Sequence, residues 1–376
     1  LWHLEHQFVM HLHDHFGLAL FGIQPLLHGV HAELDQVGGC ALHGRVDGSA
    51  FGTGARALAV IDVHGNAPDW AAIDKLRATH AGLRVVFLVD SLPQLALIEH
   101  WFTCRADAQP FEVLLEIGFT GGRTGCRSEA DALALARRLH ASTAVQFVGI
   151  ECYEGLWAKG DSTADQEWVT ILMDRVDAVA LQCVEEGLFD GDEVIVSAGG
   201  SAIFDLVAAR LNPSLGRPVL PLLRSGCYVT HDHGTYTRML QAMAPRLGCD
   251  CGDALRPALE VWALVQSRPE PGLAIVGAGK RDLSFDMGLP TPIARAAPGV
   301  LLSQLVPTGW RIDGLNDQHA YLRWDATDAA LDALAPVVGE RIGLGISHPC
   351  TTFDKWRWMP VVEADYRVSD AISIDF

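Results

Sequence analysis

A repeated unit limits most strongly what this chain can fold into. From residue 57 onward, a short apolar run is followed by a polar turn and then by a helical pattern. The six runs are Ala57–Val63, Leu83–Val89, Val113–Ile117, Val145–Ile150, Val194–Ala198 and Val219–Leu223. Nearly continuous apolar runs are typical of strands buried on both faces, and helices between them imply parallel pairing. With one or two degenerate units upstream, the pattern favours a (β/α)₈ barrel of the TIM type over an open sheet.

Helical patterns fill the segments between these runs. Glu129–His140 is rich in Ala and Leu, and the segment 164–187 places Trp168, Ile171, Leu172, Val176 and Val179 on one face. Ser201 precedes Ala202–Leu211 after a glycine turn, so we predict that it is the N-cap of a helix.

The pattern changes after about residue 255. Apolar or alternating runs with β character lie between Pro and Gly turns, at Leu259–Val265, Gly272–Val276, Val300–Val306 and Ala320–Trp324. In this part only Asp328–Val337 resembles a helix. We therefore predict two domains, a barrel over residues 1–255 and a mainly antiparallel β domain over residues 256–376.

Charge and composition exclude several classes of protein. The net charge of −18 argues against nucleic acid or an anionic membrane as the main partner. No apolar run reaches the roughly 18 residues that span a bilayer. The N-terminus lacks the layout of a secretory signal, so we predict a cytoplasmic protein. The nine cysteines have no disulfide-framework spacing, which indicates reduced thiols. Cys249 and Cys251 form a C-x-C that either binds metal or lies in a turn-like linker.

In a barrel, function resides in the loops that follow the strands. The glycine-rich loop of residues 118–127 contains Arg123 and Arg127, either of which could hold an anionic oxygen or a ring nitrogen. The alternative is a flexible turn with solvated arginines. Tyr153 follows the run Val145–Ile150 and is placed either to stack on a planar ligand or to cap the barrel mouth.

Two later segments suggest a phosphate-binding site and a metal-binding site. Residues 197–201 are small and precede a helix, which forms either a phosphate cradle or an ordinary turn. Gly226 and Tyr228, after the run Val219–Leu223, could complete that cradle. His348 and Cys350 form an H-x-C pair that suits Zn²⁺, with Asp354 near enough to be a third ligand or a partner of a ligand. The alternative is a buried Cys beside a surface His.

Taken in order, these segments resemble one family. They are Gly-Gly-Arg-Thr-Gly (121–125), Tyr-Glu-Gly (153–155), Ser-Ala-Gly-Gly-Ser (197–201), Arg-Ser-Gly-Cys-Tyr (224–228), Gly-Lys-Arg-Asp (279–282) and Ser-His-Pro-Cys-Thr-Thr-Phe-Asp-Lys-Trp (347–356). Over roughly residues 57–376 the chain resembles the D-serine dehydratase-like family. More narrowly, the chain resembles the bacterial amino acid deaminase (cryptic D-serine deaminase) branch of that family, which is related to D-threonine aldolases. That family is similar in fold to the alanine-racemase type of pyridoxal-phosphate enzyme.

The resemblance implies a site and a reaction. Arg123 and Tyr153 would flank the ring of pyridoxal 5'-phosphate as catalytic and cofactor-binding residues. The phosphate would be held by Gly199, Gly200, Ser201, Gly226 and Tyr228. His348 and Cys350 would bind Zn²⁺, which would draw off the β-hydroxyl of a small D-amino acid as a Lewis acid. The products are a 2-oxo acid and ammonia, and the fold implies a homodimer.

The lysine that the family uses to hold the cofactor is missing from its expected place. In the family it lies in a Pro-His-Gly-Lys-Thr stretch near the N-terminus, but residues 17–25 here contain no Lys. The chain has four lysines, Lys75, Lys159, Lys280 and Lys355. Of these, Lys159 follows the Tyr153 loop and is a possible substitute amine.

Two explanations fit this difference. One is an N-terminal segment that is truncated, damaged or frame-shifted, since the chain begins where the family's first barrel helix would be. The other is a non-catalytic relative. His11, His13 and His15 in this region suggest a metal site, but their spacing distributes them around a helix, so we expect a solvated helix.

The leading hypothesis is a pyridoxal-phosphate-dependent D-amino acid dehydratase or deaminase, a lyase of the D-serine ammonia-lyase type. A rival from another class is a protein that binds the cofactor without catalysis. A third is a lyase like D-threonine aldolase, whose metal loop has different ligands, so that Cys350 fits the dehydratase branch better.

Overall fold

A computed structural model describes most of the chain. The described residues are 6–11, 43–45, 57–61, 67–80, 83–106, 108–200, 202–248, 255–300 and 303–374. They form two compact units. The parallel-sheet unit comprises Pro25–Gly226, and the β unit comprises Leu1–Gln24 together with Cys227–Phe376.

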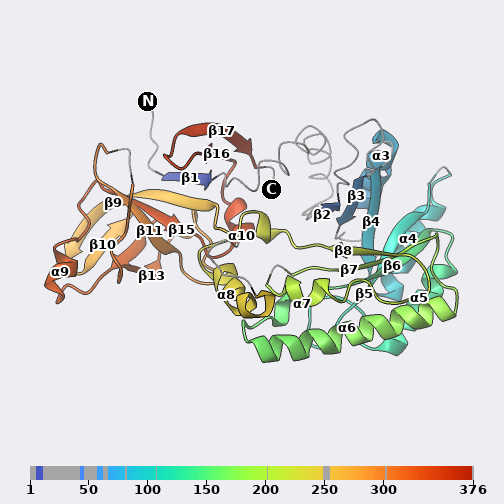
Figure 1. The fold of residues 1–376 in the computed structure, drawn as a ribbon. Helices are drawn as coiled ribbons and strands as arrows, with labels where there is room; N and C mark the ends of the chain where they lie inside the picture. The colour runs from blue at the N-terminus through green and yellow to red at the C-terminus, as the bar shows by residue number, and fades with distance from the viewer. Residues whose placement is uncertain are drawn as a thin grey trace. The chain divides into compact units, whose positions relative to one another are not determined.

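The parallel-sheet unit contains a seven-stranded sheet in chain order. Strand β2 pairs antiparallel with β3, and all later neighbours pair in parallel. The strands are β2 (His43–Arg45), β3 (Ala57–Ile61), β4 (Leu83–Val89), β5 (Phe111–Ile117), β6 (Val145–Cys152), β7 (Val194–Ala198) and β8 (Val219–Leu223). The helices, which lie along the outer side of the curled sheet (Figure 1), are α3 (Ala67–Thr79), α4 (Leu92–Thr103), α5 (Glu129–His140), α6 (Ser162–Glu185) and α7 (Phe204–Ala208).

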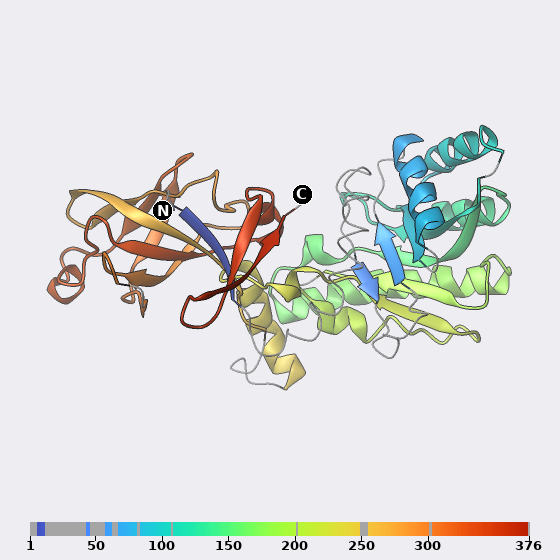
Figure 2. The same ribbon diagram turned by 90° about the horizontal axis from the view of Figure 1, so that it is seen from above.

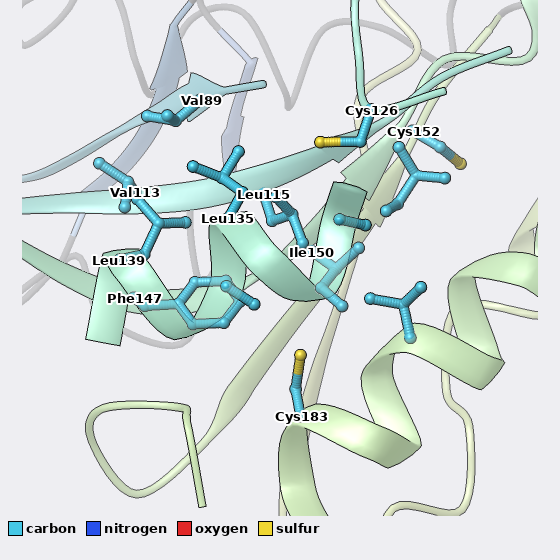
Figure 3. Close-up of a cluster of buried hydrophobic side chains, with 14 of the residues drawn as sticks. Val89, Val113, Leu115, Cys126, Leu135, Leu139, Phe147, Ile150, Cys152 and Cys183 are labelled. Carbon is cyan, nitrogen blue, oxygen red and sulfur yellow. The ribbon is translucent and has the colours of Figure 1, made fainter. Parts of the chain in front are cut away.

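Both faces of this sheet are buried, which explains the continuous apolar runs. One face packs against the helices, where Leu135 and Leu139 of α5 lie beside Val113 and Phe147 (Figure 3). The other face has its own small core, made by Val86, Leu88, Leu114, Val148, Ile195 and Leu222. Each such side chain contributes about 1.5–3 kcal/mol when fully buried. The sheet therefore has the apolar interior on two sides that a barrel-like fold requires.

Helix ends in this unit are set by local hydrogen bonds. Ser128 caps α5 by accepting a bond from the Asp131 amide at 3.1 Å, and Asp161 caps α6 through the amides of Thr163 and Ala164. Helix α7 begins only at Phe204, after Ile203. The prediction that Ser201 caps a helix over Ala202–Leu211 is therefore wrong, because the helical hydrogen bonds start two residues later.

The described residues of the β unit form a ten-stranded sheet and three helices. Its strands are β1 (His6–His11), β9 (Leu259–Glu270), β10 (Leu273–Val276), β11 (Thr291–Ala296), β12 (Gln304–Leu305), β13 (Arg311–Leu315), β14 (Ala320–Arg323), β15 (Arg341–Gly345), β16 (Trp358–Val362) and β17 (Val368–Ser373). Its helices are α8 (Thr235–Leu247), α9 (Ala329–Asp332) and α10 (Pro349–Phe353). Nearly all pairs are antiparallel, as predicted for this part of the chain.

Strand β1 comes from the far N-terminus yet lies inside this sheet, between β9 and β16 (Figure 2). It pairs antiparallel with β9 and parallel with β16. The helix predicted around His11, His13 and His15 is therefore wrong at His11, which ends a strand. Histidines at every second position occur on one face of a strand as readily as around a solvated helix. His13, His15, Cys249 and Cys251 lie outside the described residues.

The predicted fold class is confirmed: a parallel α/β sheet is followed by an antiparallel β domain. Within the described residues the parallel sheet runs from β3 to β8 and does not close into a ring. Helix α8 belongs to the compact β unit, whereas the domain boundary predicted at residue 255 assigns this helix to the barrel. In the described part of the chain, no helix combines the length and apolar character that crossing a membrane requires.

Candidate functional site

The loop after β5 is held firmly by its own arginine. The Arg127 guanidinium donates to the carbonyl oxygens of Thr124 at 2.7 Å and Gly122 at 2.9 Å. Arg175 of α6 adds a bond to the Gly118 carbonyl at 2.7 Å. Gly125 has a φ of +93°, and a Cβ there would clash with the Gly118 backbone. Arg127 is thus a structural residue that holds the loop, whereas Arg123 is exposed to solvent.

Arg123 and Tyr153 come together at this edge of the sheet. The Arg123 Cζ lies 5.1 Å from the centroid of the Tyr153 ring. Both residues line a small hollow whose other walls include Phe119, Trp157 and Trp168. A cation over an aromatic ring beside further aromatic rings suits a flat, anionic ligand. The residues predicted to flank such a ring are therefore neighbours.

The glycine turn after β7 already holds an anion, the side chain of Glu154. The Gly199 amide donates to Oε2 at 3.2 Å, and the Gly200 amide donates to Oε1. A Cβ on Gly200 would lie 2.8 Å from Glu154 Oε1 and 2.9 Å from the Gly155 Cα. Burial raises the pKa of Glu154 above its ordinary value, although these amides oppose the shift. The turn therefore forms a backbone nest for an anion, and its occupant belongs to the chain itself.

A buried ion pair lies beneath this nest and was missed by the sequence reasoning. Arg224, just after β8, pairs with Glu151 of β6 and donates to Ser197 Oγ of β7 at 2.8 Å. The Glu151 and Arg224 side chains are 1% and 11% exposed. The sequence did contain a signal: Glu151 and Arg224, which carry opposite charges, each follow directly after an apolar run. The pair joins three strand ends at the site.

The other predicted cradle residues are described less fully. Ser225 donates to the Gly200 carbonyl at 3.3 Å, which brings the loop after β8 to the glycine turn. Gly226 follows it as the last residue of the parallel-sheet unit. Ser201 lies outside the described residues, and Tyr228 belongs to the short 3₁₀ helix η3 (Cys227–Val229) of the β unit. The structure therefore brings only Gly199 and Gly200 together with that loop.

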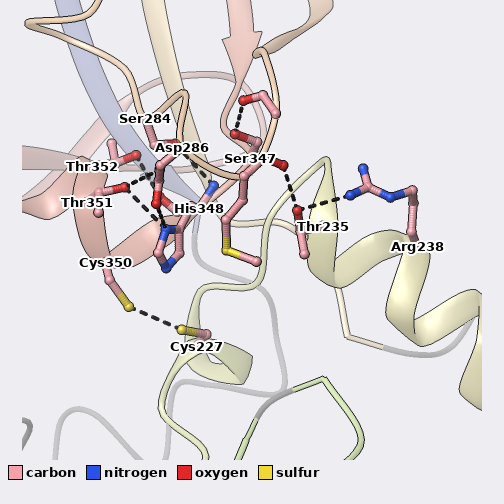
Figure 4. Close-up of polar contacts among 12 residues, drawn as sticks. Cys227, Thr235, Arg238, Ser284, Asp286, Ser347, His348, Cys350, Thr351 and Thr352 are labelled. Carbon is pink, nitrogen blue, oxygen red and sulfur yellow. Dashed lines mark hydrogen bonds and ion pairs between the residues drawn. The ribbon is translucent and has the colours of Figure 1, made fainter. Parts of the chain in front are cut away.

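His348 in the β unit has one ring nitrogen fixed by a carboxylate (Figure 4). Its Nδ1 lies 2.6 Å from Asp286 Oδ2, and Thr351 donates to Asp286 Oδ1 at 2.8 Å. Burial raises the pKa of Asp286, but the bonds with His348 and Thr351 outweigh it, so the pKa lies below its ordinary value. A carboxylate on one ring nitrogen leaves the other available to a metal. Asp286 therefore has the role that we had considered for Asp354, which is an exposed residue at the end of α10.

Cys350 lies in the first turn of α10 and faces a second thiol. Its Sγ is 3.4 Å from the Sγ of Cys227. The hydrogen bond with Cys227, together with burial, raises the pKa of Cys350. Imidazole and thiolate donors suit Zn²⁺. Among the described residues, no group of three or more His, Cys, Asp or Glu side chains converges as a metal site. His348 and Cys350 would thus leave positions open on a metal.

The four lysines lie in different places. Lys75 is in α3, and Lys159 follows the 3₁₀ helix η2 (Gly155–Trp157) in the loop after β6. Lys280 and Lys355 place their ammonium groups 5.4 Å and 5.9 Å from the Phe285 ring in the β unit. Lys159 is therefore the lysine that shares a strand-end loop with Tyr153.

These observations test whether pyridoxal phosphate suits the site. Arg123 and Tyr153 fit its ring. The amides of Gly199 and Gly200 would reach its phosphate only if the Glu154 carboxylate, which accepts from both, moved away. The donor types of His348 and Cys350, with Asp286 behind the imidazole, do fit zinc.

Comparison with known proteins shows that the chain is similar to several lyases. Residues 258–362 match the protein family described as "Putative serine dehydratase domain". The chain is 26% identical to the D-threonine aldolase of Arthrobacter over 253 residues, which are 66% of this chain and 56% of that protein. It is 28% identical to the 3-hydroxy-D-aspartate aldolase of Paracoccus denitrificans over 229 residues, 58% of this chain and 53% of that protein. The chain thus spans little more than half the length of these relatives.

A much shorter stretch is similar to a protein of another class. Over 29 residues, 8% of the chain, it is 66% identical to a protein of Xanthomonas axonopodis named "Putative pre-16S rRNA nuclease", and it covers 19% of that protein. A match of this length is too short to carry a fold or an activity.

Solved structures agree on the architecture. An alanine-racemase-like protein from Idiomarina loihiensis superposes with a TM-score of 0.64 at 15% identity, covering 99% of this chain and 96% of that one. D-threo-3-hydroxyaspartate dehydratase from a Delftia species gives a TM-score of 0.58 at 20% identity and covers 98% and 96%. Together these matches confirm the resemblance found in the sequence: the chain has the alanine-racemase-like fold, carries a serine-dehydratase-type domain and is related to lyases of D-threonine and D-3-hydroxyaspartate.

Proposed function

We propose that this protein is a pyridoxal-phosphate-dependent lyase that converts a small β-hydroxy-D-amino acid to a 2-oxo acid and ammonia. The observation that carries the proposal is the array of His348, Cys350 and Asp286. All three residues lie within the segment that matches the serine dehydratase family. The related aldolases and dehydratase act, by their names, on D-amino acids with a β-hydroxyl.

Each group of residues has a part in this proposal. His348 and Cys350 would hold zinc, which would supply a Lewis acid for the substrate's β-hydroxyl. Asp286 holds the His348 ring in one orientation and keeps its other nitrogen ready for the metal. Arg123 and Tyr153 would hold the cofactor ring, beside the aromatic side chains that line the same hollow.

D-Threonine distinguishes dehydration from aldol cleavage. Dehydration followed by deamination gives 2-oxobutanoate and ammonia, whereas cleavage between Cα and Cβ gives glycine and acetaldehyde. We expect the purified full chain, supplied with the cofactor and zinc, to give 2-oxobutanoate. Glycine and acetaldehyde as the main products would show instead an activity like that of the related aldolases.

A second candidate function is binding of the cofactor without catalysis. It is favoured by the absence of a lysine from residues 17–25, where the family that the chain resembles has its own. Borohydride reduction of the cofactor-loaded chain, followed by peptide mass mapping, separates the two functions. A pyridoxyl group on Lys159 that is lost in Lys159→Met, with Lys75→Met as the control, supports the lyase. Reversible binding with no label on any lysine supports the second candidate.

We also propose that the protein forms a homodimer, as the alanine-racemase-like fold implies. Light scattering on the purified chain tests this, and a monomeric mass at micromolar concentration would contradict it.

A further inference from the structure

Two thiols from distant parts of the sequence face each other inside the β unit. Cys227 opens η3 and Cys350 lies in α10, and their Sγ atoms are 3.4 Å apart (Figure 4). A disulfide has an S–S length of about 2.05 Å, so the sulfur atoms are about 1.4 Å from bonding distance. Because both residues belong to one compact unit, no movement between units is needed to close that distance.

This pair is more open to solvent than the three buried cysteines of the parallel-sheet unit. Cys350 is exposed and Cys227 is partly exposed. Cys126, Cys152 and Cys183 lie in the core of that unit, where an oxidant cannot reach them. Cys104 is exposed at the end of α4 and offers a matched control in the other unit.

We propose that Cys227 and Cys350 are a modification site, where a reversible disulfide forms and withdraws Cys350 from metal binding. The oxidant is a low-molecular-weight disulfide such as oxidised glutathione. One cysteine thiolate attacks it, forms a mixed disulfide and releases one reduced glutathione. The other cysteine then attacks the protein sulfur and releases the second. The pair loses two electrons and two protons, which the two glutathione molecules carry away.

The two halves of this proposal stand on different observations. The disulfide rests on the Sγ separation and exposure of the pair. The competition with metal rests on the proposed zinc site, because a sulfur in a disulfide no longer offers the thiolate that zinc binds. Oxidation would therefore empty the metal position without any change in the fold of the β unit.

The first test is a cross-link map of the metal-free full chain. The reduced protein is exposed to oxidised glutathione, trapped with iodoacetamide and digested without reductant. We expect one peptide pair that joins Cys227 to Cys350 and separates on adding dithiothreitol. Cys104→Ser should leave this link unchanged, whereas Cys227→Ser should leave Cys350 as a glutathione adduct. Separate glutathione adducts on Cys227 and Cys350 in the unsubstituted chain, or a link from either to another cysteine, would overturn the proposal.

The second test adds zinc before the oxidant. With free zinc at about ten times its Kd, the cross-link should form about tenfold more slowly, because only the metal-free fraction reacts. A cross-link that forms at an unchanged rate in zinc contradicts the metal half and with it the proposed zinc site. The disulfide itself would remain established by the map, so the two failures are distinguishable.

Discussion

At the scale of single residues, Asp286 is the side chain that orients His348, a residue of the proposed zinc site. It holds His348 at 2.6 Å and is itself held by Thr351 at 2.8 Å. Carboxylates behind a metal-binding imidazole raise metal affinity by fixing the ring and its tautomer. Asp354, equally acidic and closer in sequence to Cys350, is exposed and lies at the C-terminal end of α10.

This difference gives a paired prediction. Asp286→Asn should weaken zinc binding by about 10- to 100-fold, because the imidazole loses its anionic partner. Asp354→Asn should leave the zinc Kd unchanged. Competition with a chromophoric chelator measures both. Equal losses in the two variants would mean that overall negative charge, and not the orientation of His348, governs affinity.

Glu154 is a second residue whose environment has a measurable consequence. Its pKa is raised in the folded chain, so the folded state keeps the proton to a higher pH than the unfolded state. The stability from this difference is fully present below the ordinary pKa of 4.5 and is lost as the pH rises through the raised value. The advantage of the native chain over Glu154→Gln should therefore shrink as the pH rises from about 4.5.

Urea unfolding followed by tryptophan fluorescence at several pH values measures this trend. Glu186→Gln is the control, because Arg137 lowers the pKa of Glu186 and reverses the sign. Its native advantage should be present above pH 4.5 and fall as the pH drops. A pH-independent difference for Glu154→Gln would show that the carboxyl titrates as it does in the unfolded chain.

At the scale of elements, the ends of β6, β7 and β8 are joined by the Arg224–Glu151 pair. Removing one partner of a buried pair leaves a buried charge unpaired. Arg224→Met should lower the free energy of unfolding by about 3–5 kcal/mol. Arg137→Met removes an exposed pair with Glu186 in the same unit and should change little. Denaturant titrations that show similar losses for both variants would contradict a structural role for the buried pair.

The elements also show what the sequence could and could not predict. Strands β4, β7 and β8 and helix α5 have the predicted bounds, because a continuous apolar run or one helical stripe leaves a direct pattern in the sequence. The carboxylate of Glu154 in the glycine nest and the Asp286–His348 bond depend on contacts between loops distant in sequence. Periodicity carries no record of such contacts, so those residues could not be assigned roles beforehand.

At the scale of the whole molecule, the β unit combines strand β1 from the N-terminal end of the chain with strands from its C-terminal part. Met10 of β1 pairs with Leu259 of β9 on one side and Val361 of β16 on the other. Only three-dimensional pairing reveals this, because residues 1–24 and 227–376 are separated by the whole parallel-sheet unit. The N-terminal segment, read from sequence as part of the barrel, is thus part of the other sheet at β1.

Met10→Pro should therefore destabilise the β unit by about 1–3 kcal/mol, because it removes a backbone amide donor from a strand that has a neighbour on each side. Ala371→Pro, in the edge strand β17, should have a smaller effect, because the Ala371 amide donates to Asp370 Oδ1. Hydrogen exchange of β9 and β16 measures the loss. Unchanged protection of both strands in Met10→Pro would rule out the central position of β1.

The most direct test of the proposed function is the release of pyruvate from D-serine by the full chain. The protein is supplied with pyridoxal phosphate and zinc, and pyruvate is followed through lactate dehydrogenase. We expect pyruvate from D-serine, none from L-serine, and loss of the signal in His348→Ala. A chain that binds the cofactor and zinc yet releases no pyruvate from D-serine would contradict the assignment as a β-hydroxy-D-amino acid dehydratase.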